Sequence, residues 1–222
     1  MMATPEDLED FALGFALSEG IIDSVSACRD IEVHANTLGI EVHLEIGAAE
    51  FARLKDRRRS LAGRTGCGLC GMESLAALDL LAQPVDRPDW SHALSFDTVL
   101  GAMAAMPAHQ PINARTGATH AAAWVSSNGA IIKVMEDIGR HNALDKLIGW
   151  LAQERDRQQA VDGFVAMSSR ASYELVRKCT RLNIPALAAI SAPSGLAIKL
   201  AEQSGMGLLA FCRPKGMTVF AR

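Results

Sequence analysis

Residues 163–211 read GFVAMSSRASYELVRKCTRLNIPALAAISAPSGLAIKLAEQSGMGLLAF, and this stretch decides the fold. Short apolar runs alternate here with segments of helical periodicity that are ten or so residues long. The runs are 163–167, 186–190 and 207–211, and the helical segments are 172–182 and 195–204. Strands that alternate with helices of this length predict a mostly parallel sheet with helices on both faces. We therefore predict an α/β fold whose C-terminal domain has three layers, α/β/α.

The neighbouring segments extend this predicted domain over residues 91–222. Ser95 can cap a helix that runs to Met106, and the dipeptide Asn128-Gly129 predicts a hairpin turn. The other predicted elements are the hairpin strands 121–126 and 130–135, a helix over about 141–154 and a short terminal strand over 217–220.

Residues 1–90 form a separate predicted α+β domain. Thr4 is the expected cap of a helix with Pro5 at its first position, and this helix runs to Gly20. The alternating apolar and polar residues that follow predict a hairpin with one solvent-exposed face. The remaining predicted elements are the hairpin strands 31–34 and 40–46, a basic helix over 48–59, a helix over 72–82 and a Pro-containing linker over 83–89.

Composition excludes several classes of protein. The 222 residues carry 22 basic and 25 acidic side chains, so a net charge of -3 gives no excess that would favour nucleic acid or a membrane surface. No apolar run reaches the roughly 18 residues of a membrane span, and the chain has no signal-peptide start. Five cysteines are an odd number, which favours a reducing compartment. We expect a cytoplasmic protein.

The segment Gly66-Cys67-Gly68-Leu69-Cys70-Gly71 carries the clearest chemical signal. Arginines precede it, and nearby positive charge favours a thiolate at neutral pH. A zinc site would need two further ligands at matching spacing, and a thioredoxin-like pair would follow a strand. We expect no metal site and favour Cys67 and Cys70 as sulfur-carrying residues. Cys179, on a predicted helix, is expected in the core, whereas Cys28 and Cys212 carry no spacing signal.

Polar loops follow the ends of the predicted strands, where an open parallel sheet binds its ligands. Three of these four loops run into helix N-termini, and three carry an arginine or lysine side chain. Both features favour a phosphorylated ligand. The candidate binding residues are Asp137, Arg140, His141, Asn142, Ser169, Arg170, Ser191 and Ser194, with a further loop over 213–216. Asp137, Asn142 or Asp145 could accept a hydrogen bond from a base such as guanine. Ordinary turns and caps use the same residue types, so the loops taken singly leave that alternative open.

Three motifs, 64–71, 136–146 and 191–197, resemble the formate dehydrogenase accessory sulfurtransferase family, as do residues 1–5 and 8–15. The resemblance implies that a cysteine desulfurase delivers sulfur as a persulfide. It implies transfer of that sulfur to the molybdenum bis(molybdopterin guanine dinucleotide) cofactor, which then becomes active in the formate dehydrogenase catalytic subunit. It also implies a cofactor segment composed of Phe211, Cys212, Arg213, Pro214, Lys215 and Gly216.

The same resemblance carries further expectations. It implies a homodimer, binding of GDP-like nucleotides as mimics of the cofactor, and a C-terminal domain similar to the cytidine deaminase fold. The zinc-ligand motifs of that enzyme are absent from this sequence, so deamination is not expected. Family members usually carry several tens of residues before the Met-Met-Ala-Thr-Pro point, so the first strands of the N-terminal domain are expected to be missing. A cofactor-binding chaperone without sulfur transfer is the alternative function.

Overall fold

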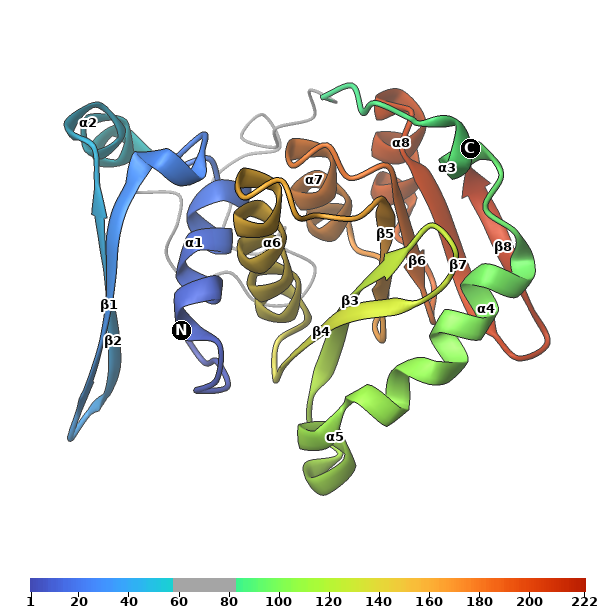
Figure 1. Cartoon of the computed structure of the whole chain (residues 1–222), viewed down its shortest axis with the longest axis horizontal. Helices are drawn as coiled ribbons and strands as arrows, with labels where there is room; N and C mark the ends of the chain where they lie inside the picture. Colours follow the sequence, from blue (N-terminus) through green and yellow to red (C-terminus); the bar gives the residue numbers. More distant parts are fainter. Residues whose placement is uncertain (58–82) are drawn as a thin grey trace.

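The computed structural model describes residues 1–57 and 83–222 (Figure 1). The predicted helix 72–82 and the candidate residues Cys67 and Cys70 lie outside the described residues. The basic helix predicted over 48–59 is α2, described over Ala48–Arg57. Within the described residues, no helix has the length and apolar character that a membrane crossing requires.

The described C-terminal part contains a six-stranded sheet in the order β4-β3-β5-β6-β7-β8. Its strands are β3 His120–Ser126, β4 Ile131–Asp137, β5 Gly163–Met167, β6 Ala186–Ala189, β7 Gly207–Arg213 and β8 Gly216–Ala221. Only the neighbours β5-β6 and β6-β7 are parallel, and the other neighbouring pairs in this sheet are antiparallel. The prediction of a mostly parallel sheet is therefore wrong. Tight turns join β3 to β4 and β7 to β8, and strands joined in this way can only pair antiparallel.

Helices cover both faces of this sheet, which confirms the three layers (Figure 1). One face packs against the longer helices, and Trp124, Val165 and Leu187 point toward them. Ala123, Phe164 and Ala188 point to the other face, where α4 lies. The helices on the first face are α6 Arg140–Asp156, α7 Tyr173–Arg181 and α8 Gly195–Ser204, with α1 Leu8–Ser18 packed against α6; the second face has α4 Phe96–Ala105 and the 3-10 helix η3 Met106–His109.

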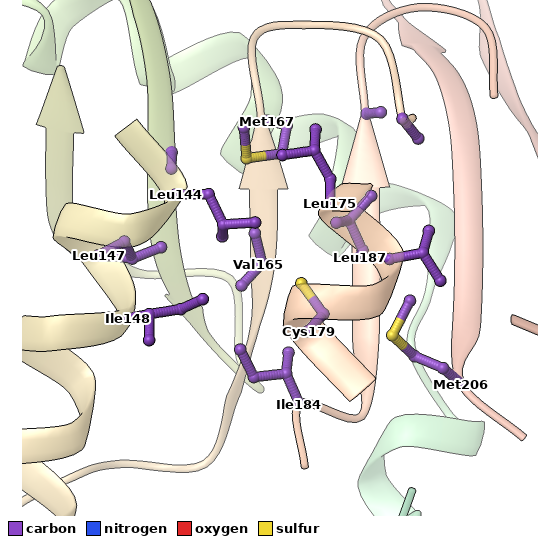
Figure 2. Packing of buried hydrophobic residues seen from close by; sticks show 14 of the residues in the cluster. Leu144, Leu147, Ile148, Val165, Met167, Leu175, Cys179, Ile184, Leu187 and Met206 are labelled. Carbon is purple, nitrogen blue, oxygen red and sulfur yellow. The ribbon is translucent and has the colours of Figure 1, made fainter. Parts of the chain in front are cut away.

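Figure 2 shows the larger core cluster between the sheet and its helices. Leu144 of α6 lies beside Val165 of β5, while Leu175 of α7 lies near Met167. Cys179 is completely buried in this cluster, and burial raises the pKa of its thiol far above the usual range. The expectation that Cys179 is a core residue is confirmed.

Helix α1 shares this core with the C-terminal part because it lies along α6. A Cβ added at Gly14 would collide with the Asp145 carbonyl, and one added at Gly149 would collide with the Asp10 carbonyl. The two glycines therefore allow the two helix backbones to approach closely. The domain boundary predicted near residue 90 stays a prediction. Helix α1, which lies before that boundary, packs into the core of the sheet domain.

The start of α1 differs from the prediction. The helix begins at Leu8, its N-cap is Asp7 in the left-handed region (φ 52°), and Thr4 does not cap it. The Thr4 amide instead donates to Asp137 Oδ2 (2.8 Å), and Thr4 Oγ1 accepts from the Ile138 amide (3.0 Å). These tertiary hydrogen bonds use the Thr4 groups that the local sequence predicted would cap the helix.

The remaining described elements are peripheral to the sheet. The predicted hairpin is present as an antiparallel pair with most side chains exposed. Ile31, Leu44 and Ile46 face the main core and anchor it. These elements are the 3-10 helix η1 Val25–Ala27, β1 Cys28–Asn36, β2 Gly39–Ile46, α3 Asp89–His92 and α5 Pro111–Thr116.

Candidate functional site

Strands β4, β5, β6 and β7 all point the same way, so their final residues meet at one edge of the sheet. We call this the carboxyl edge; it lies toward the bottom of Figure 1. The four loops that follow these strands are the site loops, with residues 136–142, 168–170, 191–194 and 213–216. Each of these loops contains predicted binding residues.

Backbone hydrogen bonds hold successive site loops together. The Ala171 amide donates to Ala192 O (3.2 Å), and the Ser194 amide donates back to Ala171 O (3.0 Å). The Phe211 amide donates to Ser191 O (3.3 Å), so β7 is hydrogen-bonded to the preceding site loop. The structure thus joins successive loops through residues that lie 20 or more positions apart in the sequence.

Cations gather at the carboxyl edge. Arg170, Arg213 and Lys215 are exposed, and Arg140 is partly exposed at the start of α6. Arg213 Nε donates to Ile190 O (3.2 Å), which fixes the base of this side chain. A set of fixed cations beside the N-termini of α6, α7 and α8 favours a ligand with several phosphates.

His120 is a residue of this edge that the sequence analysis missed. It opens β3, half-buried, opposite Asp137. Burial lowers its pKa, and the nearby charges of Arg140, His141 and Arg170 lower it further. His120 is therefore neutral near pH 7. Polar residues that follow strand ends do not reveal His120, because it stands at the start of an antiparallel strand that begins at this edge.

His141 lies in the first turn of α6 and contacts the start of α7, just after the second site loop. Its Nε2 is 2.6 Å from Glu174 Oε2 and 3.4 Å from Ser172 Oγ. The Glu174 side chain is only 6% exposed, so the carboxylate fixes the imidazole from inside the fold. Glu174 was not predicted, because its position in a helical pattern gives no sign that it faces another loop.

Asp137 and Asn142 form hydrogen bonds with each other and with neighbouring segments of the fold. Asp137 is completely buried, and its Oδ1 accepts from the Gly139 amide and from Asn142 Nδ2 (both 2.9 Å). Its Oδ2 accepts from the Thr4 amide (2.8 Å) and lies 2.9 Å from Lys146 Nζ. With four donors around it, this carboxylate positions the first site loop.

Asp145, the third candidate acceptor for a base, lies deeper still. Its carboxylate accepts from Lys178 Nζ (2.7 and 2.8 Å) and from Ser18 Oγ (2.6 Å). Lys178 also lies 2.9 Å from Glu19 Oε1, so the cluster joins α1, α6 and α7. Burial raises the pKa of Asp145, and Lys178 opposes that shift. Asp145 is part of the core at a distance from the edge surface.

The predicted serines differ in accessibility. Ser194 is exposed and its Oγ accepts from the Ala197 amide (3.2 Å), so it caps α8 as its position suggests. Ser169 is buried and donates to Arg170 O (3.1 Å). Ser191 is partly exposed, and its carbonyl is bonded to Phe211.

The predicted cofactor segment 211–216 alternates in its exposure. Phe211 is 40% exposed and has a φ of 53°, and Pro214 lies in the exposed turn before Gly216. Cys212 points to the opposite side and is buried in the cluster beneath α4. Burial raises the pKa of its thiol to about 11. The expectation that the Cys212 side chain contributes to the binding surface is therefore not met, because strand alternation turns it inward.

Exposed apolar side chains accompany the cations. Ile138, Ile190 and Phe211 are each 38–45% exposed, and each lies in or next to a different site loop. Flat or apolar ligand groups can contact such side chains while cations hold phosphates. The carboxyl edge thus suits a ligand that combines phosphates with aromatic rings.

Comparison with known proteins gives consistent matches over the whole chain. The model of the FdhD/NarQ family matches residues 1–222. A relative from Chromobacterium violaceum named "Sulfur carrier protein FdhD" is 54% identical over 220 residues, which cover 99% of this chain and 81% of the relative. A Burkholderia mallei protein of the same name is 52% identical over 220 residues, covering 97% and 80% of the two chains.

A solved structure supports the fold. The crystal structure of a protein described as a formate dehydrogenase accessory protein of Desulfotalea psychrophila superposes with a TM-score of 0.69 at 24% sequence identity. The superposition covers 99% of this chain and 79% of the other.

Proposed function

Because this chain belongs to the FdhD/NarQ family, we propose that it is a sulfur carrier required for formate dehydrogenase activity. In this proposal a cysteine desulfurase supplies the sulfur and the molybdenum bis(molybdopterin guanine dinucleotide) cofactor receives it. The observation that carries the proposal is the meeting of cations and exposed apolar side chains from four site loops at the carboxyl edge. A cofactor with phosphates and guanine rings requires both kinds of group.

The sulfur is carried on the cysteine motif. The Cys67 thiolate attacks the terminal sulfur of the donor persulfide; a new S–S bond forms on Cys67 as the donor's S–S bond breaks, and the donor cysteine leaves as a thiolate. No external oxidant is needed, since the sulfur is already in the sulfane state. Cys70 either shares the acceptor role or forms a disulfide with Cys67 as the sulfur leaves.

The cofactor is held at the carboxyl edge. Arg140, Arg170, Arg213 and Lys215 neutralise its phosphates, and the N-termini of α6 and α8 add oriented amides. Phe211 offers an exposed ring to a guanine. His141 and Ser194 complete the polar surface, while Asp137 and Asn142 hold the first loop in place.

The proposal includes the setting in which the protein acts. We infer a cytoplasmic homodimer that meets a cysteine desulfurase and the catalytic subunit of formate dehydrogenase in turn. The sheet domain serves binding in this scheme, and its likeness to the cytidine deaminase fold is part of the proposal.

Mass spectrometry tests the transfer step directly. The full chain is incubated with a cysteine desulfurase and cysteine, then digested under conditions that preserve persulfides. We expect the mass of one sulfur atom on the peptide that contains Cys67, and we expect Cys28→Ala, a change outside the motif, to load normally. A chain that binds guanine nucleotides but gains no sulfur would instead be the cofactor-binding chaperone.

A further inference from the structure

His120 opens β3 at the carboxyl edge, and the proposed sulfur transfer makes no use of it. Its backbone is held on both sides. Asp137 of β4 lies opposite it in the register, and Ser168, just after β5, is hydrogen-bonded to the next residue, Ala121. The Ala121 amide donates to Ser168 Oγ (2.7 Å), and the Ser168 amide donates to Ala121 O (3.0 Å). The His120 side chain therefore starts from an ordered part of the sheet.

Strand alternation turns the His120 side chain toward α6. Trp124, four residues further along β3, is in the core cluster beneath α6, so His120 shares that side of the sheet. Arg140 and His141 are the first residues of α6, and the charges of both act on His120. The charge of Arg170, from the second site loop, acts on it as well. His120 thus lies between the start of α6 and the second site loop.

The imidazole of His120 is available to a ligand. It makes no hydrogen bond with the described residues, and it is partly exposed. Burial lowers its pKa and the neighbouring cations lower it further, so the ring is neutral near pH 7. A neutral imidazole offers one hydrogen-bond donor and one acceptor.

His141 offers a second ring nitrogen nearby. Its contacts with Glu174 Oε2 (2.6 Å) and Ser172 Oγ (3.4 Å) both fall on Nε2, and Nδ1 makes no hydrogen bond with the described residues. In a Ser-His-acid triad the serine and the carboxylate contact opposite ring nitrogens, so these three residues do not form one. Glu174 instead holds the imidazole from inside the fold and leaves Nδ1 for a ligand.

The depth and charge of the edge residues sort the parts of a ligand. Arg170, Arg213 and Lys215 are exposed and can hold phosphates near solvent, whereas His120 is half-buried and uncharged. A neutral imidazole attracts a phosphate less than a guanidinium does, because only charged donors make charge-assisted hydrogen bonds. It can exchange hydrogen bonds with amide and amino groups, and a flat uncharged ring loses less than a phosphate when it leaves water.

We propose that His120 and His141 form a subsite for an uncharged heteroaromatic ring of the ligand. The ring is one with an amide and an amino group on its edge, which guanine and a pterin share. The His120 imidazole and His141 Nδ1 exchange hydrogen bonds with that edge, while the exposed cations hold the phosphates. This inference rests on the proposed function and deepens it, because it assigns residues to the uncharged part of the ligand.

Calorimetry on the full chain tests the subsite with GDP, guanosine, neopterin and inorganic pyrophosphate as probes. Guanosine and neopterin carry the ring without phosphates, and the one that binds more tightly identifies the preferred ring. His120→Ala should weaken binding of that probe about fivefold and leave pyrophosphate binding unchanged. His120→Gln, which keeps a donor and an acceptor, should restore part of the affinity. His43→Ala, an exposed change in the β1-β2 hairpin, is the matched control and should bind every probe like the parent chain.

NMR spectra locate the bound ring. The imidazole C–H signals of His120 and His141 should shift on addition of guanosine or neopterin, whereas those of His43 should not. The inference is overturned if neither guanosine nor neopterin binds saturably, if His120→Ala leaves their binding unchanged, or if it weakens pyrophosphate binding equally, which would make His120 a phosphate contact. The proposed function fails separately, when the parent chain gains no sulfur from the desulfurase. His120→Ala should still gain that sulfur, because the subsite acts only on the ligand.

Discussion

At the scale of single residues, Cys67 is the thiol that we propose carries the sulfur. It follows Arg64-Thr65-Gly66, whose positive charge favours the thiolate. Burial raises the pKa of Cys28 and Cys212, so these thiols are poor nucleophiles near neutral pH. We expect Cys67→Ala to abolish persulfide formation and formate dehydrogenase activation, while Cys70→Ala keeps some loading of Cys67.

Loading is measured by mass spectrometry, and activation by formate dehydrogenase activity in cells that depend on the variant. The matched control is Cys28→Ala, which should behave like the parent chain. If Cys70→Ala prevents loading while Cys67→Ala does not, the carrier assignment is reversed. If neither change has an effect, the sulfur-carrier proposal fails.

Asp10 gives a prediction about pH. Burial raises the pKa of its carboxyl to about 6, and the charge of Asp7 adds to the shift. The folded chain therefore binds this proton more tightly than the unfolded chain, so Asp10 should make the free energy of unfolding decrease as pH rises from about 4 to 6. Asp10→Asn should remove this decrease and stabilise the protein at pH 7 by about 1–2 kcal/mol, after allowance for partial exposure.

Urea unfolding at pH 4 and pH 7 checks the expectation. Asn can still accept the hydrogen bond that Gln153 Nε2 donates to Asp10 Oδ1 (2.8 Å), so the local contact is preserved. Asp156→Asn, at the exposed end of α6, is the matched control and should leave the pH dependence unchanged. An Asp10→Asn variant less stable than the parent chain at pH 7 would contradict the argument.

At the scale of elements, the close approach of α1 and α6 makes Gly14 sensitive to substitution. A methyl group at Gly14 would collide with the Asp145 backbone, which is not free to move away from the core. We expect Gly14→Ala to reduce the free energy of unfolding by about 3 kcal/mol. Gly101, within α4, has nothing within 4 Å of an added Cβ. Gly101→Ala should therefore stabilise the protein by about 0.5–1 kcal/mol.

Denaturant unfolding measures the free energy of unfolding of both variants. The two changes are matched, because each adds one methyl group to a helix. A Gly14→Ala variant with parental stability would show that the two helices separate at little cost. Such a result would also weaken the view that α1 belongs to the core of the sheet domain.

The site loops give a binding prediction. Guanine nucleotides, GDP in particular, should bind more tightly than adenine nucleotides at the carboxyl edge. Arg213→Ala or Lys215→Ala should weaken GDP binding about tenfold through lost phosphate contacts, and the effect should shrink as salt rises. Arg157→Ala, a change at the far end of α6, is the control. Calorimetry that finds equal affinity for GDP and ADP would exclude guanine selection.

Capping residues in the sequence predicted helix starts correctly where the hydrogen-bond partner lies within the same helix. Ser95 caps α4 as expected, and Ser194 caps α8 in the same way, since each side chain accepts from an amide three residues later. Thr4 has the same kind of signal, but its partners are Asp137 and Ile138, which no local pattern reveals. Helix α5 was missed because Glu136 organises its start, accepting from the Ile112 and Asn113 amides (2.8 and 2.7 Å).

At the scale of the whole molecule, the sheet shows which parts of a topology a sequence can specify. The connections through α7 and α8 fix β5, β6 and β7 as parallel neighbours, and these were predicted. The pairing of β3 with β5 depends on which edge the β3-β4 hairpin joins, and that choice is made by distant contacts. The carboxyl-edge loops were predicted because β4 happens to point the same way as the parallel strands.

The homodimer is a prediction for the assembled molecule. We expect a mass of twice 23.7 kDa at micromolar concentration, with the C-terminal domain central to the interface. Light scattering coupled to size exclusion measures this mass. A species of 23.7 kDa would contradict the dimer but would leave the proposed sulfur transfer untouched.

The hydrogen bonds around Met2 and Thr4 also matter for protein engineering. Asn142 Nδ2 donates to Met2 O (2.8 Å), and Lys146 Nζ donates to Thr4 O (3.0 Å), so the first residues are tied to the loop that carries Arg140 and His141. An affinity tag fused ahead of Met1 would emerge beside the carboxyl edge and compete with the nucleotide that we propose binds there. A tag fused after Arg222 would start at the far end of β8, which makes the C-terminus the better point of attachment for immobilised binding assays.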